Sequence, residues 1–78
     1  MSIVFQQQAK ELLAEATNCQ AKIIPEDARI GQFESWDSLA HLRLILAIEQ
    51  YIGRQLDPDE SIKIGSLADI SAILSSRR

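Results

Sequence analysis

The chain has 78 residues, of which 46% are apolar and 24% are charged. Domains typically hold roughly 100–150 residues, so we expect one domain over residues 1–78 with a small interior, which excludes a two-domain enzyme. Eleven acidic residues against eight Lys and Arg give a net charge of −3, which argues against binding to a nucleic-acid backbone.

Cysteine content and hydropathy narrow the class of protein further. Cys19 is the only cysteine, so it has no disulfide partner within the chain, and with one histidine it is too small a ligand set for a structural zinc site. The longest uninterrupted apolar run covers residues 44–48, far short of the ~20 residues that cross a bilayer. The first residues do not resemble a secretory signal, because Phe5 is followed directly by three glutamines. We therefore expect a cytoplasmic protein without a membrane span or a metal.

The first third of the chain predicts a helix and then a long connection. The apolar residues between positions 5 and 16 have the spacing of one helix face: Phe5, Ala9, Leu12, Leu13 and Ala16. Residues 17–37 lack this periodicity, and their length is well beyond that of ordinary loops of about 4–6 residues. Such a loop is usually functional or held by its own apolar side chains, for which the candidates are Ile23, Ile24, Ile30 and Phe33.

A second helix is predicted to begin at Asp37 and to end near Gly53. The Asp37 carboxylate can accept a hydrogen bond from a free backbone N–H of the first turn, and glycine is common just after a helix. Apolar residues cover most of the helix circumference, which predicts a central helix buried on several sides: Leu39, Leu42, Leu44, Ile45, Leu46, Ile48, Tyr51 and Ile52. One strip is left for solvent, made of Ala40, Arg43, Ala47, Gln50 and Arg54.

The last third predicts a short helix and a final helix. Asp57, Pro58 and Glu60 approach the capping-box pattern of a short third helix, which Gly65 ends. Ser66 then opens a fourth helix, whose apolar stripe is Leu67, Ile70, Ile73 and Leu74. The predicted fold class is therefore all-α, a four-helix bundle of three longer helices and one short helix, with a long loop between helices one and two.

Ser38 is the residue that points to a chemical function. It takes the first position of the predicted second helix, where its hydroxyl lies beside free backbone N–H groups and the positive end of the helix dipole. That environment suits a phosphate ester. A group attached there could swing freely while its point of attachment stays fixed.

The tripeptide Asp37-Ser38-Leu39 at the start of the central helix resembles the acyl carrier protein family, and the order of helices resembles it over nearly the whole chain. The resemblance implies that a phosphopantetheinyl transferase moves 4′-phosphopantetheine from coenzyme A to Ser38, with Asp37 and Leu39 beside it in the cofactor site. Acyl groups would then travel as thioesters between loading ligases and acyl-processing enzymes. The resemblance also implies a non-catalytic carrier with a sheltered space for the acyl chain, for which the candidates are Leu46, Ile62, Ile64 and Leu67. The oligomeric state stays open, although a carrier that docks in turn with several enzymes works naturally as a monomer.

The second helix departs from the pattern of carriers in general fatty-acid synthesis, which present acidic residues to basic enzymes. Between Ser38 and Leu56 the only acid is Glu49, against Arg43 and Arg54. Because complementary charge governs partner choice, we expect a dedicated carrier of a fatty-acid, polyketide or other specialised pathway. The predicted partner contacts are Ala40, Arg43, Ala47 and Gln50.

Two other functions stay open on the sequence: a peptidyl carrier loaded with an amino acid, and a cofactor-free helical adaptor that binds through the same strip. A Ser-His-Asp enzyme is disfavoured, because Asp37 adjoins Ser38 in the chain and no glycine-rich turn supplies an oxyanion hole. His41 is expected to be a surface or partner-contact residue and Trp36 to pack the loop against the bundle. Asp37 either caps the helix alone or also helps the transferase to place its metal.

Overall fold

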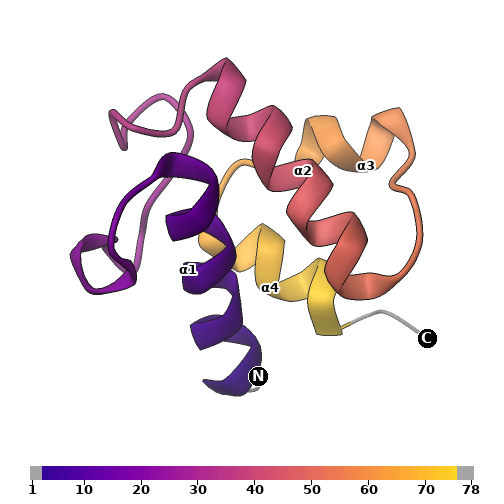
Figure 1. Cartoon of the computed structure of the whole chain (residues 1–78), viewed down its shortest axis with the longest axis horizontal. Helices are drawn as coiled ribbons and strands as arrows, with labels where there is room; N and C mark the ends of the chain where they lie inside the picture. The colour runs from indigo at the N-terminus through magenta and orange to yellow at the C-terminus, as the bar shows by residue number, and fades with distance from the viewer. Residues whose placement is uncertain (1–2, 76–78) are drawn as a thin grey trace.

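The structure, a computed structural model, describes residues 3–75. It contains α1 (Ile3–Thr17), a single 3₁₀ turn η1 (Ala21–Ile23), α2 (Ser38–Ile52), α3 (Pro58–Lys63) and α4 (Leu67–Ser75). Within these residues there is no strand, only one isolated antiparallel bridge between Arg29 and Ser66. The predicted all-α class, with three longer helices, one short helix and a long loop after the first, is confirmed (Figure 1).

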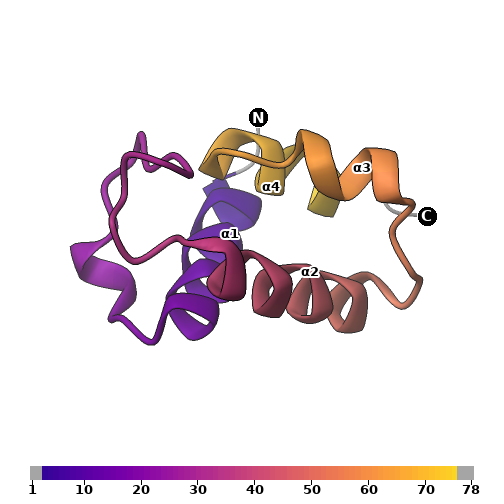
Figure 2. The same ribbon diagram turned by 90° about the horizontal axis from the view of Figure 1, so that it is seen from above.

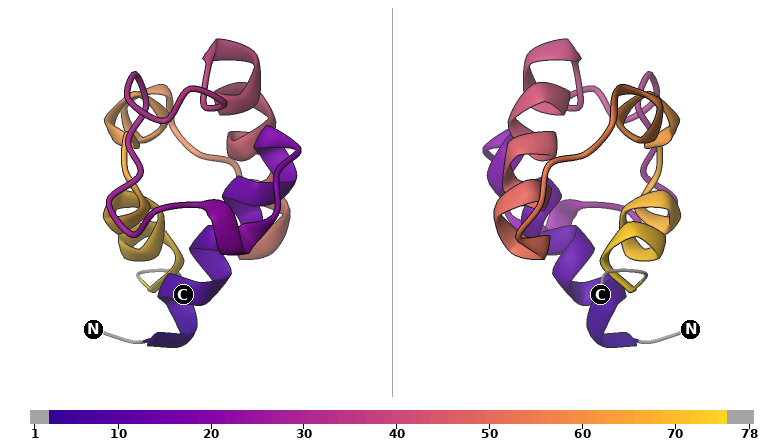
Figure 3. Two further views of the ribbon diagram at one scale, coloured as in Figure 1. Left: turned by 90° about the vertical axis from the view of Figure 1, so that its left-hand side faces the viewer. Right: turned by 90° about the vertical axis from the view of Figure 1, so that its right-hand side faces the viewer.

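The helices are arranged on two opposite sides of the molecule, with α1 between these sides. Seen from above, α2 runs along one side, α3 and α4 follow one another along the other, and α1 lies between the two sides (Figure 2). Helix α1 packs against both α2 and α4. The long loop returns past the beginning of α4 before it reaches α2 (Figure 3), and the backbone N–H of Ile30 donates to the Gly65 carbonyl there at 3.0 Å.

Three of the helix boundaries are set by local contacts that the sequence predicted. The Asp37 Oδ1 atom accepts a hydrogen bond from the Ala40 N–H at 2.9 Å and so caps α2. Gly53 ends the same helix in the left-handed conformation at φ 77°, which glycine adopts without steric cost. Glu60 accepts from the Asp57 N–H at 2.9 Å at the start of α3.

The loop is held by a different set of side chains from the one predicted. Ile24, Ala28 and Trp36 are buried and Phe33 is half-buried, so Ile24 and Phe33 are anchors as expected. Ile23 and Ile30 are exposed, and for them the prediction was wrong. The reason for Ile30 is that its backbone is bridged to the segment before α4, which leaves its side chain to cover Gly65 from outside.

The orientation of α2 also differs from the prediction. Its buried residues form one row spaced by four: Ala40, Leu44, Ile48 and Ile52. Leu39, Leu42 and Leu46 were expected inside and are instead 56%, 58% and 55% exposed. Helix α2 is therefore buried on one face, not on several, because α1 and α4 cover one side and α3 buries no side chain of its own against it.

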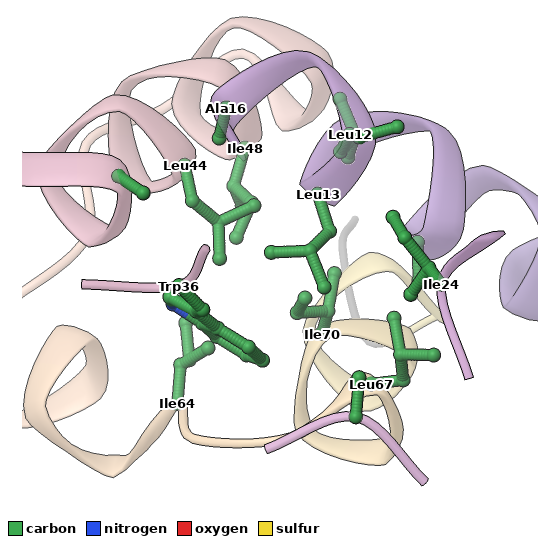
Figure 4. Packing of buried hydrophobic residues seen from close by; sticks show 14 of the residues in the cluster. Leu12, Leu13, Ala16, Ile24, Trp36, Leu44, Ile48, Ile64, Leu67 and Ile70 are labelled. Carbon is green, nitrogen blue, oxygen red and sulfur yellow. The ribbon is translucent and has the colours of Figure 1, made fainter. Parts of the chain in front are cut away.

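The core lies where α1, α2, α4 and the end of the loop meet. Leu13 of α1, Leu44 and Ile48 of α2 and Ile70 of α4 are fully buried (Figure 4). The Trp36 ring enters the same cluster from the loop. The start of α2 is therefore fixed by a core residue that lies two positions before Ser38.

Candidate functional site

Ser38 lies at the first position of α2 with an exposed side chain. Asp37 uses its carboxylate to cap the Ala40 N–H, while the backbone N–H groups of Ser38 and Leu39 have no acceptor among residues 3–75. Two free donors and the positive helix end surround one accessible hydroxyl. This arrangement can hold a phosphate ester at Ser38.

Trp36 anchors the segment that leads into Ser38. Its side chain is 1% exposed, and its backbone N–H donates to the Phe33 carbonyl at 2.9 Å. The Phe33 N–H in turn donates to the Arg29 carbonyl at 2.8 Å. Trp36 thus packs the loop onto the bundle, as the sequence indicated, and places Ser38 at the edge of a fixed core.

His41 makes two hydrogen bonds that the sequence did not reveal. The Trp36 Nε1–H donates to His41 Nδ1 at 3.1 Å, and His41 Nε2 lies 3.0 Å from the carbonyl oxygen of Ser61 in α3. An indole nitrogen only donates, so Nδ1 must accept, and the ring proton therefore lies on Nε2, which donates to Ser61. We refer to the contacts that join Trp36, His41 and Ser61 as the histidine bridge.

The histidine bridge corrects the prediction for His41. The residue is half-buried and engaged inside the molecule, not a free surface residue. Sequence spacing could not find this, because Ser61 is 20 residues away and α3 comes next to α2 only in the tertiary structure. Both ring nitrogens are occupied, so His41 offers no base to the Ser38 hydroxyl.

The predicted partner strip is only partly exposed. Arg43 and Gln50 face solvent, Ala47 is half-buried, and Ala40 is 4% exposed. Ala40 belongs to the buried row of α2, so the prediction that it lies on the solvent-facing strip was wrong. An open groove of about 290 Å³ between α1 and α2 is lined by Glu15, Ala16, Arg43, Leu46, Ala47 and Gln50, and Ala47 is therefore reachable along it.

Two of the charges near the end of α2 are used within the molecule. Glu49 Oε2 accepts the backbone N–H of Leu56 at 2.8 Å. Arg54 pairs with Glu60 through two N–H···O bonds, each 3.1 Å. Arg43, by contrast, makes no ion pair within the described part of the chain, so it is an unpaired cation on the outer face of α2.

The four residues expected to shelter an acyl chain differ in burial. Ile64 and Leu67 are buried in the core, whereas Leu46 is exposed on α2 and Ile62 is 79% exposed on α3. Leu46 and Ile62 are therefore not part of the buried core, and their role towards an acyl chain stays a prediction. Helix α3 buries none of its own side chains, and Ile62 points to solvent. The chain enters the core only after this helix, from Ile64 on.

Residues 3–75 contain neither a membrane-spanning helix nor a cluster of metal-binding side chains. No helix there is both long enough and apolar enough to cross a membrane. In the same residues, His, Cys, Asp and Glu side chains do not gather in groups of three that could hold a metal ion.

Comparison with known proteins identifies relatives along almost the whole chain. No family model matches. The acyl carrier protein of Rickettsia canadensis (strain McKiel) is 32% identical over 74 residues, which are 95% of this chain and 86% of that protein. The acyl carrier proteins of Rickettsia conorii (strain ATCC VR-613 / Malish 7) and Rickettsia prowazekii (strain Madrid E) match with the same identity and coverage.

Proposed function

Because the chain belongs to the acyl carrier protein family, and is thus a carrier and not an enzyme, we propose that Ser38 bears a 4′-phosphopantetheine arm. The observation that supports this most directly is the exposed Ser38 hydroxyl at the leading end of α2, beside two unpaired backbone N–H groups. Asp37 holds that helix end in place through its contact with Ala40.

Attachment would be carried out by a separate phosphopantetheinyl transferase. The Ser38 oxygen forms a new bond to phosphorus of coenzyme A, loses its proton, and displaces the nucleotide half of the coenzyme. When bound, the arm supplies a thiol that holds acyl groups as thioesters at high effective concentration near each docked enzyme. Leu39, exposed next to Ser38, lies where the transferase must approach.

The attachment site can be tested by intact mass. We expect the chain to gain one phosphopantetheine after incubation with coenzyme A and a broad-specificity transferase, and Ser38→Ala to gain none. Ser35→Ala is the matched control, since Ser35 is an exposed serine three residues earlier, and it should be loaded like the wild type. An unmodified wild-type chain would instead support the cofactor-free adaptor.

The finer proposal is that this carrier serves a specialised fatty-acid, polyketide or related pathway and that Arg43 helps to select its enzymes. Arg43 is exposed and unpaired where carriers of general fatty-acid synthesis are acidic. A cation there favours partners with acidic docking residues and repels basic ones.

The test is the loading rate with the cognate acyl ligase. Arg43→Glu should slow loading about tenfold at low ionic strength, because a charge at the edge of an interface chiefly changes the association rate. Lys22→Glu makes the same change of charge at an exposed residue of η1 and should leave the rate unchanged. Equal loading rates for Arg43→Glu and Lys22→Glu would show that Arg43 takes no part in the choice of partner. Loading by an amino-acid-adenylating enzyme alone would identify a peptidyl carrier.

A further inference from the structure

Helix α3 has few apolar contacts to hold it in place. It covers Pro58–Lys63 and buries none of its own side chains. Its first turn is tied to the preceding segment by the Arg54–Glu60 pair and by the contact of Glu60 with the Asp57 N–H. The position of the second half of α3 therefore depends on the groups that bind the backbone carbonyls at the C-terminal end of this helix.

The carbonyl of Ser61 is one of these groups. The last four carbonyls of a helix have no partner inside the helix, and the Gly65 N–H, four residues beyond Ser61, donates to Asp69 Oδ2 at 2.9 Å instead. The acceptor capacity of Ser61 is taken up by His41 Nε2 at 3.0 Å. A side chain of α2 thus caps the end of α3.

The other nitrogen of the same ring satisfies a buried donor. Trp36 is almost fully buried, and a buried indole N–H needs an acceptor, which His41 Nδ1 provides at 3.1 Å. The two ring centroids are 6.1 Å apart with 26° between their planes, so the rings are also nearly parallel. One ring therefore connects α3 to the segment that leads into Ser38.

We propose that His41 is a positioning residue: through the histidine bridge it holds α3 and the entry to α2 in one arrangement, and this arrangement forms the surface around Ser38 that the transferase recognises. The second part rests on the proposed attachment at Ser38. The first part is a statement about the apo chain and can be tested alone.

The bridge has a direct spectroscopic test, because the chain contains one tryptophan and one histidine and each gives a single set of ring signals. ¹⁵N NMR of the wild type should show the His41 proton on Nε2 and an unprotonated Nδ1. The indole N–H should exchange slowly with solvent. A proton on Nδ1 would overturn the proposal without any variant being made.

Two matched variants separate the two bonds. Asparagine can place its carbonyl oxygen near the position of Nδ1, and glutamine can place its amide nitrogen near that of Nε2. His41→Asn should keep the slow indole exchange and speed amide exchange in α3 roughly fivefold to tenfold, whereas His41→Gln should do the reverse. Amides of α1 serve as the internal control for folding. Unchanged α3 and indole exchange in both variants would contradict the bridge.

The functional part is read from transferase kinetics with the full chain. His41→Asn should raise KM for the apo-carrier several-fold with little change in kcat, because the recognised surface is displaced while the Ser38 hydroxyl is kept. Lys22→Ala is the remote control. An unchanged KM together with altered amide exchange in α3 would refute the proposal that the histidine bridge affects recognition by the transferase. Failure of the wild-type chain to be loaded would refute the proposed function, and the NMR result would still stand.

Discussion

Arg54 and Glu60 meet through two parallel N–H···O bonds of 3.1 Å across the turn that joins α2 to α3. The hydrogen bond from Arg54, together with the backbone N–H of Asp57, lowers the pKa of Glu60 to about 2, and the same contact raises the pKa of Arg54. The carboxylate that caps α3 thus stays charged well into acid.

This pair predicts a specific pH dependence of stability. A carboxylate whose pKa is lowered by folding stabilises the folded chain above its unfolded value, near 4.5, and loses that contribution as the pH falls towards about 2. Arg54→Gln should therefore lower the thermal midpoint at pH 7, with the difference from wild type shrinking between these two values. Lys63→Gln, which removes an exposed cation of α3, should show no such trend. Parallel curves for wild type and Arg54→Gln would contradict the assignment.

Two substitutions of Asp37 separate its role as a helix cap from the role of its negative charge in loading by the transferase. Asp37→Ala should lower the free energy of unfolding by about 1 kcal/mol, because the Ala40 N–H loses its acceptor. Asp37→Asn retains a capping oxygen and should change stability little, yet it should load phosphopantetheine more slowly if the carboxylate helps the transferase to place its metal. Urea denaturation and loading rates measure the two effects. A wild-type loading rate for Asp37→Asn would leave Asp37 as a cap alone.

A pair of leucines on α2 tests which face of that helix is buried. Leu44 is fully buried and Leu42 is 58% exposed. Leu44→Ala should cost roughly 2–5 kcal/mol of unfolding free energy, and Leu42→Ala should stay within about 0.5 kcal/mol of wild type. Chemical denaturation provides both values. Similar losses for the two variants would mean that α2 is buried on both faces, as its apolar pattern first indicated.

Ser71 is a buried hydroxyl for which a stabilising substitution is expected. Its side chain lies in α4 at 4% exposure, and its oxygen has no hydrogen-bond partner among the residues that the structure describes. An unsatisfied buried polar group costs about 1–3 kcal/mol, so Ser71→Ala should raise the unfolding free energy by about 1 kcal/mol. Ser75→Ala, at an exposed serine of the same helix, should be near neutral. A loss of stability in Ser71→Ala would show that the hydroxyl has a partner.

Helix boundaries and the place of Ser38 followed from the sequence alone, because the interactions that set them are local. The Asp37 cap acts on a residue three positions away, and Gly53 ends its helix through its own backbone conformation. Glu60 likewise binds the N–H three residues before it. Such contacts join near neighbours, so the sequence shows both partners together, and it therefore located Ser38 at the start of a helix.

Which face of α2 is buried was decided only by tertiary packing. Apolar residues surround most of α2, so its sequence contains several possible buried faces, and the positions of α1 and α4 select the row through Leu44. The same choice exposes Leu42 and buries Ala40. His41 becomes a bridge for the same reason, since Ser61 comes within reach of its ring only when the chain folds and places α3 across from α2 (Figure 2). Hydrophobic burial has no preferred direction of its own, so a helix with apolar residues on most sides takes its orientation from its neighbours.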